Sequence, residues 1–229
     1  MTERPYVLLS CAASIDGCID DATEDRLLLS NDADFDRVDA ERARCDAILV
    51  GSTTISNDNP RLLVRSAARR AERVARGLPA TPAKVTVTGH GDLDAAAQFF
   101  ATGDTEKIVY SATSALDKAR QKVGAVATVV DAGDPVDLWR AMADLARRGI
   151  RKLMVEGGST MHTQFLAAGL ADELQLVVAP FFVGDSQAPR FINDGRFPWT
   201  SQHRARLAEV TQIDDVVLLR YALSERCGA

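Results

Sequence analysis

The residues best suited to chemistry stand where an apolar stretch ends, at Glu156-Gly157-Gly158-Ser159-Thr160. Two glycines without side chains let a phosphate group approach the backbone, and a helix that begins after them offers free N–H groups and a favourable dipole. The pattern therefore predicts a site for the diphosphate of a dinucleotide cofactor. It matches neither G-x-G-x-x-G nor G-x-x-x-x-G-K-[ST], so the Rossmann and P-loop fingerprints do not apply. The alternative is a tight strand-to-helix turn with a structural role alone.

Glu156 is a candidate catalytic residue at the end of the same strand. A carboxylate without a partner would be repelled by a neighbouring diphosphate. If the glycines bind phosphate, we expect Glu156 to point away from it, toward a neutral or cationic group of the substrate. The alternative is a structural ion pair with an arginine at the edge of the sheet.

A second strand end opens into a short polar turn at Val50-Gly51-Ser52-Thr53-Thr54. Ligands of open parallel sheets bind beyond the carboxyl ends of the strands. Gly51 and Thr54 are thus expected to meet Gly157 and Gly158 at one crevice, and two such turns are better evidence than one.

The stretch from Ser52 to Arg65 is predicted to be a loop, because Asn57-Asp58-Asn59-Pro60 is typical of turns. An arginine can bind a phosphate with two parallel hydrogen bonds, and a carboxylate accepts from hydroxyl or amine donors. Asp58, Arg61 and Arg65 could therefore hold a sugar phosphate. A solvated loop is the alternative, and the arginine-rich segment from Arg65 to Arg76 is interpreted as a solvated helix face unless one arginine reaches a phosphate.

The elements that must position these residues alternate between strand and helix. We expect strands at Tyr6–Ala13, Ala47–Val50, Lys84–Thr88, Lys107–Tyr110, Ala125–Val130, Lys152–Val155, Leu174–Ala179, Ala205–Thr211 and Val216–Leu223. Helices are expected from a Ser30 cap to Arg44, at Thr113–Lys122, from an Asp134-Pro135 start to Arg148, and at Ser159–Ala168. The pattern predicts an α/β fold with a mixed, mostly parallel sheet flanked by helices, ending in an antiparallel hairpin around Ile213-Asp214-Asp215.

Composition narrows the class of protein. The 229 residues are expected to form a single domain, 1–229, and a net charge of -5 argues against nucleic acid as a partner. No apolar segment approaches the roughly 20 residues of a membrane helix, and the N-terminus does not resemble a secretion signal, so we expect a soluble, cytoplasmic protein without a membrane partner. The four cysteines form no C-x-x-C pair and are expected to be buried free thiols, while the three histidines are scattered, so no metal site is predicted.

Several weak motifs recur in order from one end of the chain to the other. They are Arg4-Pro5-Tyr6-Val7, Ser14-Ile15-Asp16-Gly17, Ala47-Ile48-Leu49-Val50-Gly51 with Thr54, Asp58-Asn59-Pro60-Arg61-Leu62 with Arg65, Val155-Glu156-Gly157-Gly158, Ala168-Gly169-Leu170-Ala171-Asp172-Glu173-Leu174 and Ala179-Pro180. In this combination the chain resembles the reductases of riboflavin biosynthesis, both the stand-alone diaminopyrimidine reductases and the C-terminal half of the bifunctional deaminase-reductase. The zinc-deaminase pattern H-x-E…P-C-x-x-C is absent, which leaves only the reductase half.

The resemblance implies a dihydrofolate-reductase-like fold, a homodimer, and NADPH as the hydride donor for reduction of a ribosylaminopyrimidine 5′-phosphate to its ribitylamino form. It implies that Gly51, Thr54, Gly157, Gly158, Ser159 and Thr160 contact NADPH. It also implies that Ser30, Asp58, Arg65 and Glu156 face the substrate, with Asp58 or Glu156 stabilising iminium character or relaying a proton.

Two positions depart from the pattern of that family. Cys18 stands where the family usually has a lysine after Asp16-Gly17, and Asn59 replaces the second acid of the usual Asp-Asp-Pro. The lysine would be expected to touch the substrate, so its loss bears on the substrate more than on the cofactor. The alternatives are a paralogous NADPH-dependent reductase of a dihydropterin, dihydrofolate or another pyrimidine-like heterocycle, and an NADPH-binding module without catalysis.

Overall fold

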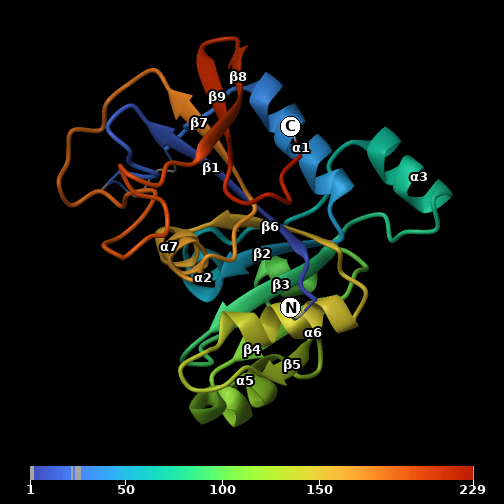
Figure 1. The fold of residues 1–229 in the computed structure, drawn as a ribbon. Coiled ribbons are helices and arrows are strands. Elements are labelled where there is room, and N and C mark those ends of the chain that lie inside the picture. The colour runs from blue at the N-terminus through green and yellow to red at the C-terminus, as the bar shows by residue number, and fades with distance from the viewer. Residues whose placement is uncertain (1–2, 22, 24–26, 229) are drawn as a thin grey trace. The chain divides into compact units, whose positions relative to one another are not determined.

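Nine strands of the described residues form one mixed sheet in the order β5-β4-β3-β2-β6-β1-β7-β9-β8 (Figure 1). The computed structural model describes residues 3–21, 23 and 27–228. The strands are β1 Tyr6–Ser14, β2 Ala47–Gly51, β3 Ala83–Thr88, β4 Lys107–Ser111, β5 Thr128–Asp131, β6 Lys152–Gly157, β7 Glu173–Ala179, β8 Arg206–Ile213 and β9 Val216–Ala222. The pairs β1–β7, β2–β3, β3–β4 and β4–β5 are parallel, whereas β7–β9 and β8–β9 are antiparallel. The predicted α/β architecture with a terminal hairpin is confirmed.

The helices connect these strands. They are α1 Asp32–Arg44, α2 Ser52–Asp58, α3 Ala67–Ala75, α4 Gln98–Ala101, the 3-10 turn η1 Thr113–Ala115, α5 Leu116–Val123, α6 Leu138–Arg147 and α7 Ser159–Ala167. Within the described part of the chain, none of them is long and apolar enough to cross a membrane. The chain divides into two compact units: Asp39–Met154 together with the residues up to Pro5, and Tyr6–Val38 together with the residues from Val155 onward. That residues 1–229 act as a single domain stays a prediction.

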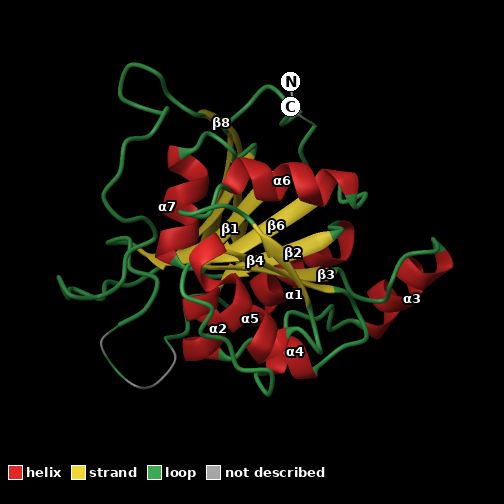
Figure 2. Cartoon of the chain, turned by 90° about the horizontal axis from the view of Figure 1, so that it is seen from below, coloured by secondary structure: helices red, strands yellow, loops and turns green. Residues whose placement is uncertain are grey.

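The first unit carries helices on both faces of strands β2 to β5, as Figure 2 shows. Alternate residues of a strand point to opposite faces, so Ile48 and Val50 of β2 share one face. They pack with Ile55 of α2, Phe99 of α4 and Val123 of α5, which places these three helices on that face. On the opposite face, the Tyr110 hydroxyl of β4 donates to Asp144 of α6 at 2.9 Å. Strands buried on both faces explain why their sequences read as continuous apolar runs.

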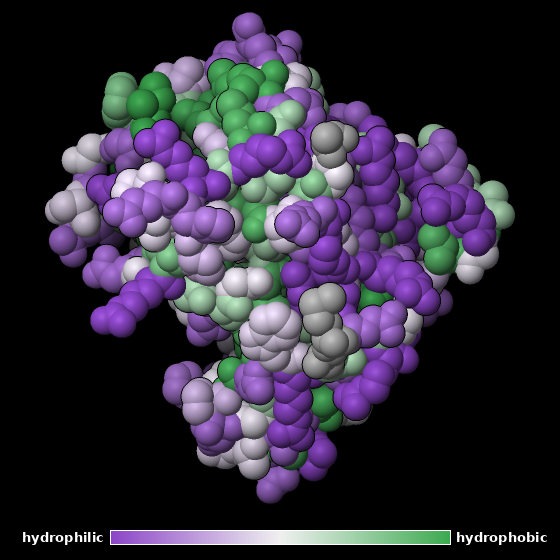
Figure 3. Space-filling view, in the orientation of Figure 1, coloured by the Kyte–Doolittle hydropathy of each residue, from purple (hydrophilic) through white to green (hydrophobic). Residues whose placement is uncertain are grey.

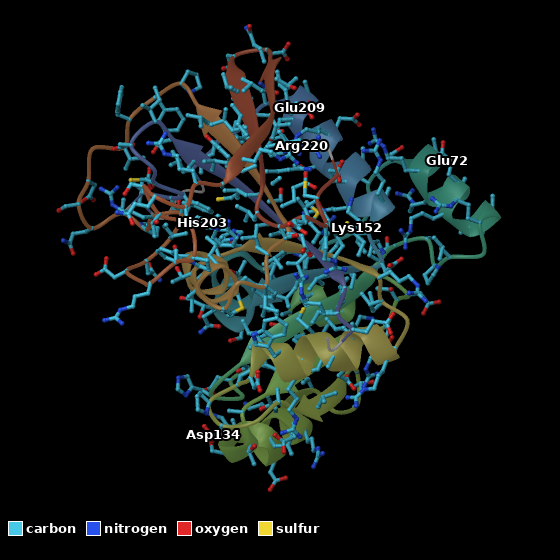
Figure 4. All side chains as sticks on the ribbon, in the orientation of Figure 1. Glu72, Asp134, Lys152, His203, Glu209 and Arg220 are labelled. Atoms are coloured by element: carbon cyan, nitrogen blue, oxygen red, sulfur yellow. The ribbon has the colours of Figure 1, made fainter. Side chains whose placement is uncertain are left out.

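The second unit contains β1, β7, β9 and β8 with helix α7 and the part of α1 up to Val38. Helix α1 lies on the sheet face that carries Gln175, because Arg37 of α1 donates to the Gln175 side chain. Val177, Val216 and Leu218 form a buried cluster on the same face. The Arg220 guanidinium of β9 contacts Glu209 of β8 at 2.6 Å, and both residues are labelled on the hairpin in Figure 4.

Two helix starts differ from the sequence prediction. Helix α6 begins at Leu138 rather than at Asp134-Pro135, because the Asp137 side chain accepts from the N–H groups of Trp139 and Arg140 and caps the helix there. Helix α1 is capped by Asn31, whose side chain accepts from the Asp34 N–H at 3.0 Å. The predicted cap, Ser30, donates to the Asp34 carboxylate instead.

Candidate active site

The hydroxyl-rich turn is the connection from β2 into α2. Gly51 ends the strand and is also the N-cap of the helix, with φ -69° and ψ 155°, an extended conformation open to any residue. No side chain caps the helix, and its first turn carries no acidic residue. Thr54 lies in this first turn and is half-buried, while Ile55 anchors the helix in the core. The turn thus presents backbone N–H groups and hydroxyls without negative charge.

The loop predicted from Ser52 to Arg65 is wrong in its first half, which is helix α2. Burial of Ile55 stabilises a helix whose hydroxyl and amide residues have weak helical propensity on their own. The helix ends at Asp58, and Asn59 adopts a left-handed conformation with φ 44°. Pro60 therefore marks the end of the helix rather than preventing it.

Asp58, Arg61 and Arg65 are exposed residues of one segment of the first unit, in which Leu62 and Val64 are buried. The Arg61 guanidinium donates to the Gln98 side chain, and the Gln98 N–H donates to Asn59 at 2.7 Å, so this part of the loop is fastened to α4. Arg65 has a side chain that is 58% exposed, 3.9 Å from Asp39. The segment thus places one carboxylate and two guanidinium groups at the surface.

Asp39 fixes the far end of this segment. Its carboxylate accepts from the backbone N–H groups of Arg65 and Ser66 and from the Arg69 guanidinium at 3.0 Å. Burial alone would raise the pKa of Asp39, but these hydrogen bonds and the positive charge outweigh burial and lower it. The backbone at Arg65 is therefore held by a charged, buried group.

One arginine of the segment from Arg65 to Arg76 contradicts the predicted solvated face. Arg73 is only 3% exposed and donates to the carbonyls of Ala43, Cys45 and Pro79, each at 2.8 Å. The guanidinium satisfies carbonyl groups at the end of α1 and after α3, which a helical pattern in one segment cannot reveal. The rest of α3 is largely exposed, as expected.

The glycine-rich turn is the connection from β6 into α7 in the second unit. Glu156 is half-buried near the end of β6, and a cis peptide bond joins Gly157 to Gly158. Gly157 has φ +132°, which side-chain-bearing residues rarely adopt. Gly158 is the N-cap of α7, so no side chain satisfies the first N–H groups of the helix. Ser159 and Thr160 form its first turn, which contains no acidic residue.

His162 lies in the first turns of α7 and was not singled out by sequence. Its side chain is 1% exposed, and neither ring nitrogen has a hydrogen-bond partner among the described residues. Burial lowers its pKa to about 4, so the ring is neutral near pH 7. A buried polar group without a partner costs about 1–3 kcal/mol. The available signal was its position four residues after Gly158, on the helix that the glycines open.

A segment before β8 covers the first turn of α7. The Ser159 hydroxyl donates to the Arg190 carbonyl, and the Asn193 N–H donates to the Thr163 hydroxyl at 2.8 Å. The Phe191 ring lies against the His162 ring, with centroids 5.4 Å apart. The Ser159 hydroxyl, which was predicted to contact the cofactor, thus donates a hydrogen bond within the protein.

The same segment pairs with the turn that contains Cys18. Cys18 and Arg190 form an isolated antiparallel bridge, Cys18 is fully buried, and the Arg190 guanidinium donates to the Asp16 carbonyl at 3.0 Å. The Asp16 carboxylate accepts from the Ser14 hydroxyl and from the N–H groups of Gly184 and Val183. These hydrogen bonds lower the pKa of Asp16 to about 2, so the turn is fixed by a carboxylate that stays ionised.

Ser30, the remaining predicted substrate residue, belongs to a polar network of the second unit. Its hydroxyl donates to Asp34, which also accepts from Arg37 at 2.6 Å. Arg37 reaches Gln175, and the Gln175 amide donates to Glu173 at 2.9 Å. Within each unit the predicted residues therefore fall into local groups: Gly51 to Arg65 in the first, and Ser30 and Glu156 to Thr160 in the second.

Comparison with known proteins places the chain among riboflavin-pathway reductases. The RibD C-terminal domain family matches residues 5–219. The chain is 33% identical over 186 residues to the 2,5-diamino-6-ribosylamino-4(3H)-pyrimidinone 5′-phosphate reductase of Archaeoglobus fulgidus, covering 81% of this chain and 85% of the relative. It is 35% identical over 194 residues to the protein of the same name from Methanothermobacter thermautotrophicus, covering 84% and 85%.

Solved structures agree with this assignment. A RibD structure from Acinetobacter baumannii is 26% identical, superposes with a TM-score of 0.74, and is matched over 96% of this chain and 58% of that one. A pyrimidine reductase-like protein from Corynebacterium diphtheriae has the same fold, with a TM-score of 0.78 at 22% identity over 95% of this chain and 91% of that one. The resemblance drawn from scattered motifs is confirmed, and the chain belongs to the RibD C-terminal domain family.

Proposed function

We propose that this protein is an NADPH-dependent reductase of riboflavin biosynthesis that converts a ribosylaminopyrimidine 5′-phosphate to its ribitylamino form. The observation that carries the proposal is the family match over residues 5–219, together with two relatives above 30% identity that bear the name of this reductase. The uncapped N-terminus of α7 behind two glycines is the feature of this chain that fits a dinucleotide phosphate.

The residues divide into cofactor and substrate groups in this proposal. Gly51, Thr54 and the residues Gly157 to Thr160 would hold NADPH through backbone N–H groups or hydroxyls near a helix start. Bound there, NADPH would supply the hydride that reduces the ring-opened imine form of the substrate at C1′, and the substrate nitrogen would take up a proton to give the ribitylamine. Asp58 or Glu156 provides that proton or stabilises the iminium charge before transfer.

The arginines position the substrate and do not transfer protons. Arg61 and Arg65 bind the 5′-phosphate, because a guanidinium matches two phosphate oxygens at once. Anchoring the phosphate keeps C1′ in place for hydride transfer. Ser30 contacts the substrate from the network around Asp34, which holds its hydroxyl in a fixed direction.

The deciding experiment measures NADPH consumption by the purified protein with the diaminopyrimidine substrate, and separately with dihydropterin and dihydrofolate. Turnover with the diaminopyrimidine alone supports the proposal, whereas turnover only with a pterin or folate assigns the chain to the alternative reductase. Binding of NADPH without turnover on any substrate would assign it to a cofactor-binding module. Asp58→Ala should lower kcat by about 100-fold or more with little change in NADPH affinity. Full turnover by this variant excludes Asp58 from the chemistry.

The open face of the hairpin supports a homodimer. Residues directly opposite each other in antiparallel strands share a face, and one face of β7, β9 and β8 is apolar and only partly covered. Its members are Leu174, Leu176, Val178, Val217, Leu219, Tyr221, Leu207 and Val210. Leu207 and Val210 are 51% and 57% exposed. Figure 3 shows apolar side chains gathered over the hairpin, and a second copy of the chain is the partner that covers this face in the proposal.

Sedimentation tests the dimer directly. Val210→Lys places a charge in the apolar face and should shift the protein from dimer to monomer, since burying an unpaired ammonium is costly. Glu209→Lys, the neighbouring change on β8, introduces the same side chain outside the apolar face, on a residue paired with Arg220, and is the control. A wild-type protein that sediments as a monomer at all concentrations removes the homodimer from the proposal.

A further inference from the structure

The first turns of α7 contain a buried polar group that the proposed mechanism does not use. His162 is 1% exposed, and neither of its ring nitrogens has a hydrogen-bond partner in the described chain. Buried polar groups in folded proteins nearly always have a partner. A ring with two unsatisfied nitrogens therefore indicates that a ligand supplies a hydrogen-bond partner.

The direction of the ring identifies where that ligand must lie. A side chain at Gly157 would begin 3.7 Å from the Nε2 atom of His162, so the space left free by this glycine borders the ring nitrogen. Phe191 contacts the ring, with centroids 5.4 Å apart, and helps to hold its orientation. Nε2 is thus aimed at the glycine-rich turn.

The neighbouring groups are those of an anion site. Helix α7 has nine residues, its N-cap is Gly158, and no side chain caps it. The Ser159 hydroxyl donates to the Arg190 carbonyl and does not cap the helix. The first turn carries no acidic residue and no side-chain cap, so the helix dipole favours a negative charge there.

We propose that His162 is a further cofactor-binding residue, whose Nε2–H donates to a phosphate oxygen of the dinucleotide diphosphate held at the N-terminus of α7. The inference rests on the proposed function, because it requires that the glycine turn binds NADPH. Burial keeps the ring neutral near pH 7, so one nitrogen donates while the other remains an acceptor. The histidine adds a side-chain hydrogen bond to those that backbone N–H groups at a helix start donate to an anion.

Calorimetric titration with NADPH separates this role from a packing role. His162→Phe keeps a flat ring but removes both nitrogens, and should weaken NADPH binding by about tenfold to a hundredfold, the range for a hydrogen bond to a charged group. His162→Gln retains a donor and should recover part of the loss. Adenosine 2′-phosphate, which lacks the diphosphate, should bind wild type and His162→Phe equally. His203→Gln, an exposed histidine on the segment before β8, is the matched control (Figure 4).

Imidazole NMR gives a second measurement on the unmodified protein. Saturating NADP should shift the ring nitrogen signals of His162, assigned by their absence in His162→Gln, while His90 and His203 serve as exposed references. Unchanged His162 signals, or NADPH affinity of His162→Phe within twofold of wild type, overturn the inference. Loss of substrate affinity with unchanged NADPH affinity overturns it as well. A wild-type protein that binds no NADPH instead contradicts the proposed function itself.

Discussion

The turn after β2 and the turn after β6 both lead from a buried strand into a helix without a side-chain cap, yet they differ in what holds them. At Gly51 the backbone is extended, and the seven-residue helix α2 carries hydroxyl groups at its start. At Gly157 the backbone has φ +132°, and a buried histidine faces the turn. The first turn could be built from many sequences, whereas the second requires glycine. The requirement for glycine is thus confined to the second of the two turns.

The largest expected difference in stability is between serine substitutions at Gly157 and at Gly51. Gly157→Ser forces a side chain into a conformation that costs about 1–3 kcal/mol, although space is available, since a Cβ there meets His162 only at an ordinary 3.7 Å. Gly51→Ser should stabilise α2 by a few tenths of a kcal/mol, because serine is a good N-cap in an extended conformation. Urea unfolding and NADPH titration of the two variants measure the difference. Equal losses of stability would contradict the contrast between the turns.

A change of pH is expected to have an intermediate effect on the free energy of unfolding. The folded protein holds His162 neutral down to a pKa of about 4, whereas the unfolded chain takes up the proton near pH 6.5. Between these values the unfolded state binds more protons, so stability should fall by roughly 2 kcal/mol from pH 7 to pH 5. His162→Phe should lose this part of the pH dependence, and His203→Gln should keep it. Helix α2 contains no histidine, so its turn should not respond in this range.

The smallest effect is expected at the hydroxyl-rich turn. Thr54→Val keeps the shape of the side chain but removes its hydroxyl, and should weaken NADPH binding by about threefold to tenfold, the range for one neutral hydrogen bond. The exposed neighbour Thr53→Val is the control and should bind NADPH as wild type does. A loss at Thr54 as large as that at Gly157 would mean that the two turns contribute equally.

The central strands of the sheet were predictable because they are buried on both faces. Runs such as Ala47–Val50 contain no polar residue, and only a covered strand permits this in a short segment. The hairpin around Asp214 followed from two apolar runs separated by a short polar turn. Element bounds were less certain: β5 begins at Thr128 rather than at Ala125, because residues before it complete the turn after α5.

Residues whose burial depends on contacts with distant parts of the chain could not be identified from the sequence. Arg73 resembles its exposed neighbours on α3, and only the carbonyls of Ala43 and Cys45, nearly thirty positions away, explain its burial. His162 stands on a helix whose polar and apolar residues do not separate into clear faces, so its burial could not be inferred. The candidate glycines and hydroxyls, in contrast, were visible because strand ends and helix starts are local features.

The backbone pairing of Cys18 with Arg190 joins the turn after β1 to the segment before β8. Cys18 is fully buried, and the Arg190 guanidinium lies over the turn, 3.9 Å from where a side chain at Gly17 would begin. A lysine introduced at position 18 would place an ammonium group at a fully buried position, which is costly without a partner. A charged side chain at position 18 therefore requires the buried contacts of this turn to change with it.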